Sequence, residues 1–427
     1  MLPLFLALQM SLAPVGSGQP QDTLSRVTLE EALQRAAQLD PDYVAAVRQT
    51  TDAAWSRRAA RTAFLLPAVT AQLSTTRYSS EFFNIGTGEP ASTIVDARID
   101  GQLNLFAGLS KLHELARANA EVEGAEANEL RARFATALLT ETDYYDVIAQ
   151  RELTRVAEER VRRAEEQLAI ARARVIAGAA VQTDSLQLLL EVQQARVELL
   201  RQAARLKVSR YQLARRIGSF RPADAAEEDL LPAPELPLSE EEAIREAISS
   251  SPEAVFSRSN EGAAEAQLRS LKGDYLPRVD LFGRVSATDE TFFPSAATRS
   301  SFGITFSLPI WNNGQREIAL SRAVTARDVA RAARGDVELA LQRDVVQAYE
   351  AYEAAKAAFE LASQSVVVAQ ENLRVQEERY RSGATTIIDL ITAQVSLSET
   401  EAELVRSRYT TRLALSGLEA ILGRRLF

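Results

Sequence analysis

Two aspartates follow two glycines at the same spacing, within stretches that otherwise read as long helices. Asp184 stands six residues after Gly178, and Asp389 stands six residues after Gly383. Glycine adopts the left-handed backbone conformation at low cost, so each glycine predicts a turn between two helices. A carboxylate in the first turns of the returning helix would complement the helix dipole. Alternatively, the matched carboxylates would form a ring of negative charge in a closed ring of hairpins.

Residue types that carry out catalysis or bind metals are scarce in this chain. The sequence has no cysteine and a single histidine, His113, which lies in a predicted helix with no second histidine to share a metal. A nucleophile with its base, or a cluster of metal ligands, is therefore missing. The net charge of −9 argues against a nucleic-acid partner. We expect no enzyme activity, no cofactor and no metal site.

The chain repeats one unit of about 200 residues, a length that suits a duplicated structural repeat. Residues 144–218 align without a gap to residues 349–423, and "EEALQRAAQLDP" at 30–41 matches "EEAIREAISSSP" at 241–252. A segment rich in proline and acidic residues separates the two copies. The predicted organisation is a first repeat at 19–219, a linker at 220–240 and a second repeat at 241–427.

The first 18 residues predict a secretory signal peptide. They form a short apolar run followed by small residues, without a basic residue before Arg26. No later apolar run approaches the roughly 20 residues that a membrane-spanning helix needs. If the protein enters a membrane, we expect it to do so with strands.

Each repeat contains two segments in which apolar and polar residues alternate. The predicted strands lie at about 69–78 and 94–105 in the first repeat, and at about 279–288 and 301–310 in the second. Their length and single apolar face suit a tilted transmembrane strand, and also an ordinary antiparallel sheet packed on helices. Four strands are too few to close a membrane barrel, so a barrel would need several chains.

The remaining segments predict long coiled-coil helices. Residues 109–176 contain no proline and would reach roughly 100 Å as one helix. Residues 315–381 are the matching segment, and returning helices are expected at 180–217 and 385–422, after hairpin tips at 177–180 and 382–385. The returning helices carry leucines in a seven-residue repeat, which predicts a buried seam: Leu390, Leu397, Leu404 and Leu418.

These features together resemble the TolC-like outer-membrane efflux proteins, also called outer membrane factors. The most specific motif is "YRSGATTIIDL" at 380–390, which looks like the hairpin signature of that family. "LFAG" at 105–108 and "PIWNNGQR" at 309–316 look like its junctions between strand and helix. The resemblance covers essentially the whole chain after the signal region.

The resemblance implies a mostly α fold with a membrane β-barrel part. Four strands from each chain of a homotrimer would make one 12-stranded barrel in the outer membrane, and the helices a periplasmic tunnel. The chain would be the passive exit duct of a tripartite efflux or type I secretion system. Its partners would be outer-membrane lipid, an inner-membrane pump and a periplasmic adaptor, which would dock on the hairpin tips at Gly178, Ala179, Gly383 and Ala384.

The same resemblance implies a closed aperture near the tips. Its residues would be Thr183, Asp184, Tyr380 and Asp389, with Tyr380 donating a hydrogen bond to Asp184. The sequence departs from the family pattern at two positions, which hold Thr385 in place of an arginine and Thr392 in place of a second aspartate. Fewer ionic links would then close the aperture, with Arg379 or Arg381 as candidate substitutes.

One alternative is a periplasmic coiled-coil adaptor or structural protein without a pore. Such a protein would explain the seven-residue repeats and the hairpins. It would not explain the alternating strands that stand between helices in both copies of the repeat. Extraction would separate the two readings, because a barrel protein requires detergent.

Overall fold

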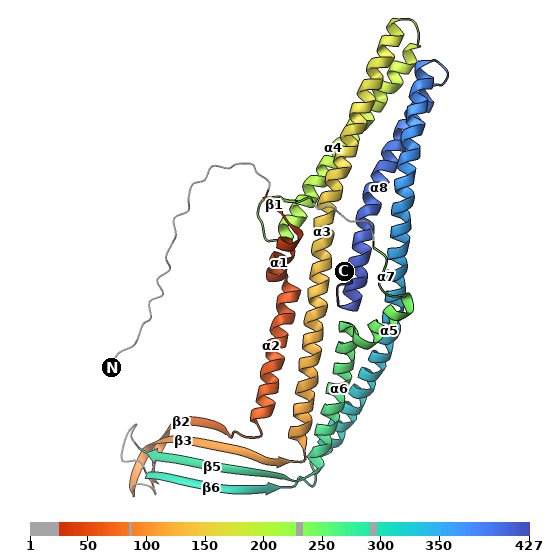
Figure 1. Ribbon diagram of the computed structural model, residues 1–427. Helices are drawn as coiled ribbons and strands as arrows, with labels where there is room; N and C mark the ends of the chain where they lie inside the picture. The colour runs from red at the N-terminus through yellow and green to blue at the C-terminus, as the bar shows by residue number, and fades with distance from the viewer. Residues whose placement is uncertain (1–24, 85–87, 228–233, 291–296) are drawn as a thin grey trace.

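The computed structural model describes residues 25–84, 88–227, 234–290 and 297–427. The predicted signal peptide and part of the predicted linker lie outside these ranges. The molecule is elongated, with a four-stranded sheet at one end and two helical hairpin tips at the other (Figure 1). Long helices connect the two ends.

The two repeats contain the same elements in the same order. The first comprises α1 (Leu29–Leu39), α2 (Pro41–Thr62), β2 (Ala68–Asn84), β3 (Glu89–Ala107), α3 (Ser110–Ile176) and α4 (Gln182–Arg216). The second comprises α5 (Glu240–Ser250), α6 (Pro252–Lys272), the 3-10 turn η1 (Gly273–Tyr275), β5 (Arg278–Asp289), β6 (Ala297–Ser307), α7 (Gln315–Arg381) and α8 (Ile387–Leu422). Two short strands, β1 (Ser25–Val27) and β4 (Ala223–Ala225), pair in parallel.

The second helix of each repeat starts with the same local device. Asp40 accepts hydrogen bonds from backbone amides at the start of α2, and Ser251 accepts one at the start of α6. Pro41 and Pro252 occupy the first helical position, where a missing N–H is harmless. The caps and prolines therefore break each helical layer at the same place in both copies.

The sheet is antiparallel, in the order β2-β3-β5-β6. Its strands are longer than the alternation predicts, since β2 has 17 residues and β3 has 19. The difference lies in polar and aromatic extensions such as "TTRYSSEFF", where no apolar alternation marks the strand, and the pairing shifts between Arg77 and Phe82. The register aligns one exposed apolar face across the sheet: Val69, Leu73, Ile99, Leu281, Val285, Phe302 and Ile304.

The opposite face of the sheet is polar and internally paired. Arg284 and Arg98 both form ion pairs with Asp100 in the middle of the sheet. Asn104 donates to Asp280 at 2.9 Å, across the β3–β5 pair. Within the described residues, no further strand pairs with the outer edges of β2 and β6. The sheet thus has one apolar face, one polar face and two open edges.

The long helix α3 packs along α2 and α6 near the sheet and along α4 towards the tips (Figure 1). Most of the predicted leucine seam is confirmed as buried, whereas Leu404 is partly exposed. Leu390, Leu397 and Leu418 on α8 are at most 4% exposed, as are Val192 and Leu213 on α4. Across the described helices, none combines the length and apolarity needed to cross a membrane.

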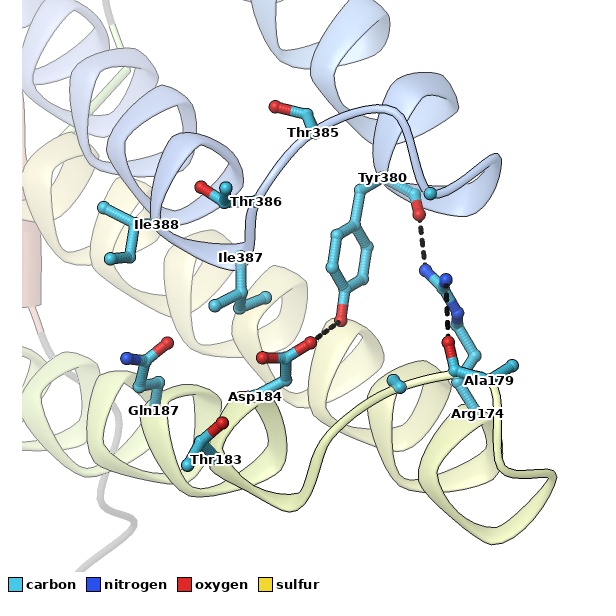
Figure 2. A pocket seen from close by; sticks show the side chains of 12 residues that line it. Arg174, Ala179, Thr183, Asp184, Gln187, Tyr380, Thr385, Thr386, Ile387 and Ile388 are labelled. Atoms are coloured by element: carbon cyan, nitrogen blue, oxygen red, sulfur yellow. Dashed lines mark hydrogen bonds between the residues drawn. The ribbon is translucent and has the colours of Figure 1, made fainter.

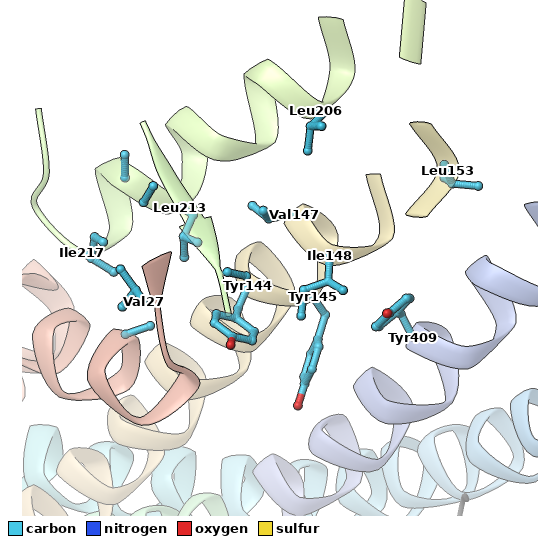
Figure 3. Close-up of a cluster of buried hydrophobic side chains, with 14 of the residues drawn as sticks. Val27, Tyr144, Tyr145, Val147, Ile148, Leu153, Leu206, Leu213, Ile217 and Tyr409 are labelled. Carbon is cyan, nitrogen blue, oxygen red and sulfur yellow. The ribbon is translucent and has the colours of Figure 1, made fainter. Parts of the chain in front are cut away.

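An aromatic core holds the middle of the molecule together. Tyr144 and Tyr145 on α3 meet Tyr409 on α8 and Leu213 on α4 (Figure 3). Tyr144 also donates to the carbonyl oxygen of Ala226, next to the two-stranded sheet. This core ties both repeats and the chain's short strands into one body.

A contact between two glycines forms the corner between sheet and helices. Gly108 follows β3 directly and has a φ of 59°, and it lies against Gly273 at the end of α6. A Cβ on either glycine would overlap the carbonyl oxygen of the other. Only glycine fits both positions, because backbone atoms cannot move aside as a flexible side chain can.

Candidate functional site: the paired hairpin tips

Both tips turn at the predicted glycines. Gly178 has a φ of 71° and Gly383 a φ of 78°, values that favour glycine. Each turn is a Schellman motif, in which the amide after the glycine bonds back into the last helical turn. Ala179 N donates to Arg174 O at 2.8 Å, and Ala384 N donates to Arg379 O at 2.7 Å.

The two matched aspartates have different local partners. Asp389 forms a capping box with Thr386, whose hydroxyl and amide donate to Asp389 Oδ2 at 2.7 and 3.1 Å. Thr385 Oγ1 adds a third bond at 2.9 Å. The Thr386 hydroxyl and these further donors lower the pKa of Asp389. Asp389 therefore lies in the first turn of α8, as the interpretation based on the helix dipole requires, and it also caps the helix, which was not predicted; its side chain is exposed.

Asp184 lacks such a cap, because the residue in the corresponding position is Val181. Its carboxylate instead accepts a hydrogen bond from the hydroxyl of Tyr380 on the other hairpin, at 3.4 Å (Figure 2). Tyr380 is only 4% exposed. Burial raises the pKa of the Tyr380 hydroxyl, and the nearby Asp184 carboxylate raises it further. The link that the resemblance implied is thus present within one chain.

A cavity of about 420 Å³ separates the two tips. Residues of both hairpins line it, including Thr183, Asp184, Gln187, Thr385 and Ile388 (Figure 2). Asp389 is not among the lining residues. Three of the four predicted aperture residues therefore meet around this space, since Tyr380 lines it too, and Asp389 stands apart.

The charged residue of this site that the sequence did not predict is Arg174, and the lining residues Gln187 and Ile388 were not predicted either. The Arg174 guanidinium lies 4.7 Å from the centre of the Tyr380 ring and donates to the Tyr380 carbonyl oxygen. It also donates to Ala179 O at 3.3 Å, within its own hairpin. The signal in the sequence was that Arg174 aligns with Arg379 in the second repeat.

The two arginines named from the sequence serve other contacts. Arg379 donates to Ala384 O at 3.3 Å, and Arg381 pairs with Glu378 at 3.1 Å. Neither contact crosses between the hairpins. The cation that joins the two tips therefore comes from the first hairpin.

A duplicated chain with long hairpins, and a sheet whose outer face is apolar, defines a channel-type membrane protein. A family model described as outer membrane efflux protein matches residues 31–219 and 243–424, which is most of the chain. The chain belongs to the outer membrane efflux protein family. It is an outer-membrane channel for efflux with a periplasmic helical tunnel.

Individual relatives agree with this assignment. The outer membrane efflux protein BepC of Brucella suis biovar 1 is 25% identical over 354 residues, covering 80% of this chain and 76% of BepC. A membrane protein of Pseudomonas aeruginosa has the same fold, with a TM-score of 0.78 at 20% identity, covering 99% of this chain and 97% of that one. VceC of Vibrio cholerae also gives a TM-score of 0.78, at 17% identity, covering 93% and 97%.

Proposed function

We propose that three copies of this chain form one exit duct, in which twelve strands close a shared barrel and the hairpins form a tunnel. The observation that carries this proposal is the sheet with two open edges and an exposed apolar face. Open edges leave backbone groups unpaired, which is not tolerated in lipid. Pairing β6 of one chain with β2 of the next removes every edge, and three chains of four strands give an even-numbered barrel.

The helices support association with further copies. On α7, Leu361, Val368 and Val375 are exposed at seven-residue intervals, and on α4, Leu190 and Val197 repeat at the same interval. Such a stripe is typical of a coiled-coil surface that packs on another helix. In a ring of three chains, α7 of one chain would cover α4 of the next, so the tunnel wall would close as the barrel does.

The tips close the duct in this proposal. Asp184, Thr183 and Tyr380 would line the narrowest aperture, with Asp389 adding a further carboxylate from each chain. The hydrogen bond between Tyr380 and Asp184 supports this role, because it joins the two hairpins near their ends. A ring of carboxylates would favour cations over anions in a closed or partly open aperture.

The outermost turns would receive the adaptor. Gly178, Ala179, Gly383 and Ala384 belong to the turns between α3 and α4 and between α7 and α8, and these turns form the extreme end of the molecule (Figure 1). A Cβ on either glycine would meet no atom within 4 Å. An open surface made of small residues suits close packing with partner helices. The transport energy would come from an inner-membrane pump joined through the adaptor, in an efflux or type I secretion system, and the duct itself would be passive.

The alternative from the sequence, a pore-free periplasmic coiled-coil protein, is not favoured. A pore-free protein would have no use for the exposed apolar face of the sheet, because no helix packs on that face. The apolar strands favour the duct.

The proposal is tested by extraction and mass measurement. Membranes are washed with high salt, then extracted with detergent, and the purified protein is measured by native mass spectrometry. We expect the chain to resist salt and to leave detergent as a trimer. Release by salt alone, or a detergent-extracted monomer that holds its fold, would contradict the shared barrel.

A further inference from the structure

Helix α3 carries four charged residues at intervals of eleven, and each of them contacts the second repeat. They are Glu141, Glu152, Arg163 and Arg174. Eleven residues make just over three full turns of an α-helix, so side chains at this spacing lie near one line along it. The line runs from the middle of the molecule to the tips.

Along most of this line the partners are side chains of α8. Glu141 is 1% exposed, whereas the side chains of Glu152 and Arg163 are partly exposed, at 31% and 20%. Each pair fixes α3 and α8 against sliding, because a charged hydrogen bond is short and directional. The partners are Ser416 for Glu141, Tyr409 for Glu152 at 2.7 Å, and Glu401 for Arg163 at 2.9 Å.

Arg174, the last residue of the line, bonds to backbone carbonyls instead. Helix α7 ends at Arg381, so the carbonyl of Tyr380 belongs to its last turn, where it accepts from Gly383 N at 3.1 Å and takes a second hydrogen bond from the guanidinium. Ala179 lies just beyond the end of α3. A cation is favourable at both places because each is the negative end of a helix dipole. One guanidinium thus bonds to the end of α7 and to the turn that follows α3.

The second repeat offers an internal comparison. Arg379 aligns with Arg174 and makes the same bond within its own tip, to Ala384 O at 3.3 Å. It has no aromatic ring to stack on, because the residue that aligns with Tyr380 is Val175. Only Arg174 therefore combines a cap with a contact between hairpins.

We propose that Arg174 is a positioning residue that holds Tyr380 within reach of Asp184 and so keeps the two tips of one chain together. The Arg174 guanidinium stacks on one face of the Tyr380 ring and donates to the Tyr380 carbonyl oxygen (Figure 2). The Asp184 carboxylate accepts a hydrogen bond from the Tyr380 hydroxyl. This arrangement supplies, from the first hairpin, the cation that is missing at Thr385. The inference rests on the proposed aperture.

The test uses spin labels on cysteines introduced at Gln187 and Ile388. Both residues line the cavity, one on each hairpin, and the natural chain has no cysteine to interfere. Labelled chains are diluted with unlabelled ones in detergent-extracted trimers, and the distance within one chain is measured by pulsed electron resonance. The variants are Arg174→Ala, Arg174→Lys and the matched control Arg379→Ala.

We expect Arg174→Ala to lengthen and broaden the distance distribution, with about a tenfold rise in the tip-separated population, as for loss of one charged hydrogen bond. Arg174→Lys should restore part of the short distance, and Arg379→Ala should leave it unchanged. An unchanged distribution in Arg174→Ala, or an equal change in Arg379→Ala, overturns the inference.

The same trimers are then tested for conductance, which separates the two proposals. If the tips separate in Arg174→Ala and conductance rises, the positioning role and the aperture both stand. If the tips separate without any change in conductance, Arg174 positions Tyr380 but the aperture lies elsewhere, which overturns the proposed function at this site. Loss of trimers in Arg174→Ala but not in Arg174→Lys would assign Arg174 to assembly and also overturn the inference.

Discussion

At the scale of single residues, one threonine decides how an aspartate at the tip is used. Asp389 stands three residues after Thr386, which caps the helix and donates hydrogen bonds to the Asp389 carboxylate. Asp184 stands three residues after Val181, which has no hydroxyl group. The Asp184 carboxylate accepts a hydrogen bond from Tyr380 instead. Matched positions in a repeat therefore need not have matched roles, because a single side chain nearby redirects the hydrogen bond.

The capping role of Asp389 predicts a pH dependence. Its pKa is lowered from an ordinary value of 3.8, so the cap contributes fully above that pH and is lost as the pH falls through the lowered value. We expect lower protection factors for the amides in the first turn of α8 at acid pH, that is, faster exchange relative to the intrinsic rate at the same pH, with Asp389→Asn measured at each pH. If wild type and variant exchange alike at neutral pH, the carboxylate does not stabilise the cap.

The proposed aperture predicts ion selectivity. Replacing Asp184 or Asp389 by alanine removes one carboxylate per chain, and we expect the preference for cations to fall, as read from reversal potentials across a salt gradient. Asp184 should have the larger effect because it faces the cavity between the tips. Unchanged selectivity in Asp389→Ala would mean that Asp389 acts only as a cap.

At the scale of elements, each turn at the tips needs a residue in the left-handed conformation and also leaves an open surface around that residue. We expect arginine at Gly178 or Gly383 to abolish export while trimers remain, since the new side chain would stand on the adaptor surface. Alanine is the matched control, because it adds only the cost of the left-handed conformation, about 1 kcal/mol. Export assays and gel mobility of trimers provide the readouts, and loss of trimers with arginine would count against a docking role.

The glycine corner predicts a large effect on stability. Gly273→Ala places a Cβ against the carbonyl of Gly108, and overpacking of this kind costs about 1–3 kcal/mol. Gly335→Ala on α7 is the control, since its Cβ meets no atom within 4 Å and alanine favours a helix by about 1 kcal/mol. In thermal unfolding, Gly273→Ala should lower the melting temperature and Gly335→Ala should raise it. Equal melting temperatures would show that the corner relaxes freely.

At the scale of the whole molecule, periodicity explains what the sequence could predict. The long helices, the four strands and the buried leucine seam follow from repeats of seven and two residues, which depend only on neighbours in the chain. Contacts between distant segments leave no such pattern. Arg174 meets Tyr380 from the other repeat, and Gly108 meets Gly273, so neither contact was foreseen. The extra length of β2 was missed because its end lacks apolar alternation.

Contacts between the two repeats also explain why the chain is duplicated. One repeat supplies two strands and one hairpin, and the line of charged contacts from Glu141 to Arg174 exists only between two repeats. Duplication therefore gives each chain a hairpin pair that can be held closed from within. The trimer then requires only identical contacts between chains, as expected for a symmetric ring.

The most direct test of the account is single-channel conductance of detergent-extracted protein in a planar bilayer, with both tip links removed in the double variant Arg174→Ala, Tyr380→Phe. We expect discrete openings that prefer cations and are larger or more frequent than in the wild type. In this variant the Tyr380 and Arg174 contacts that join the two tips of each chain are absent. Folded trimers of it that conduct no ions would contradict a duct through this protein.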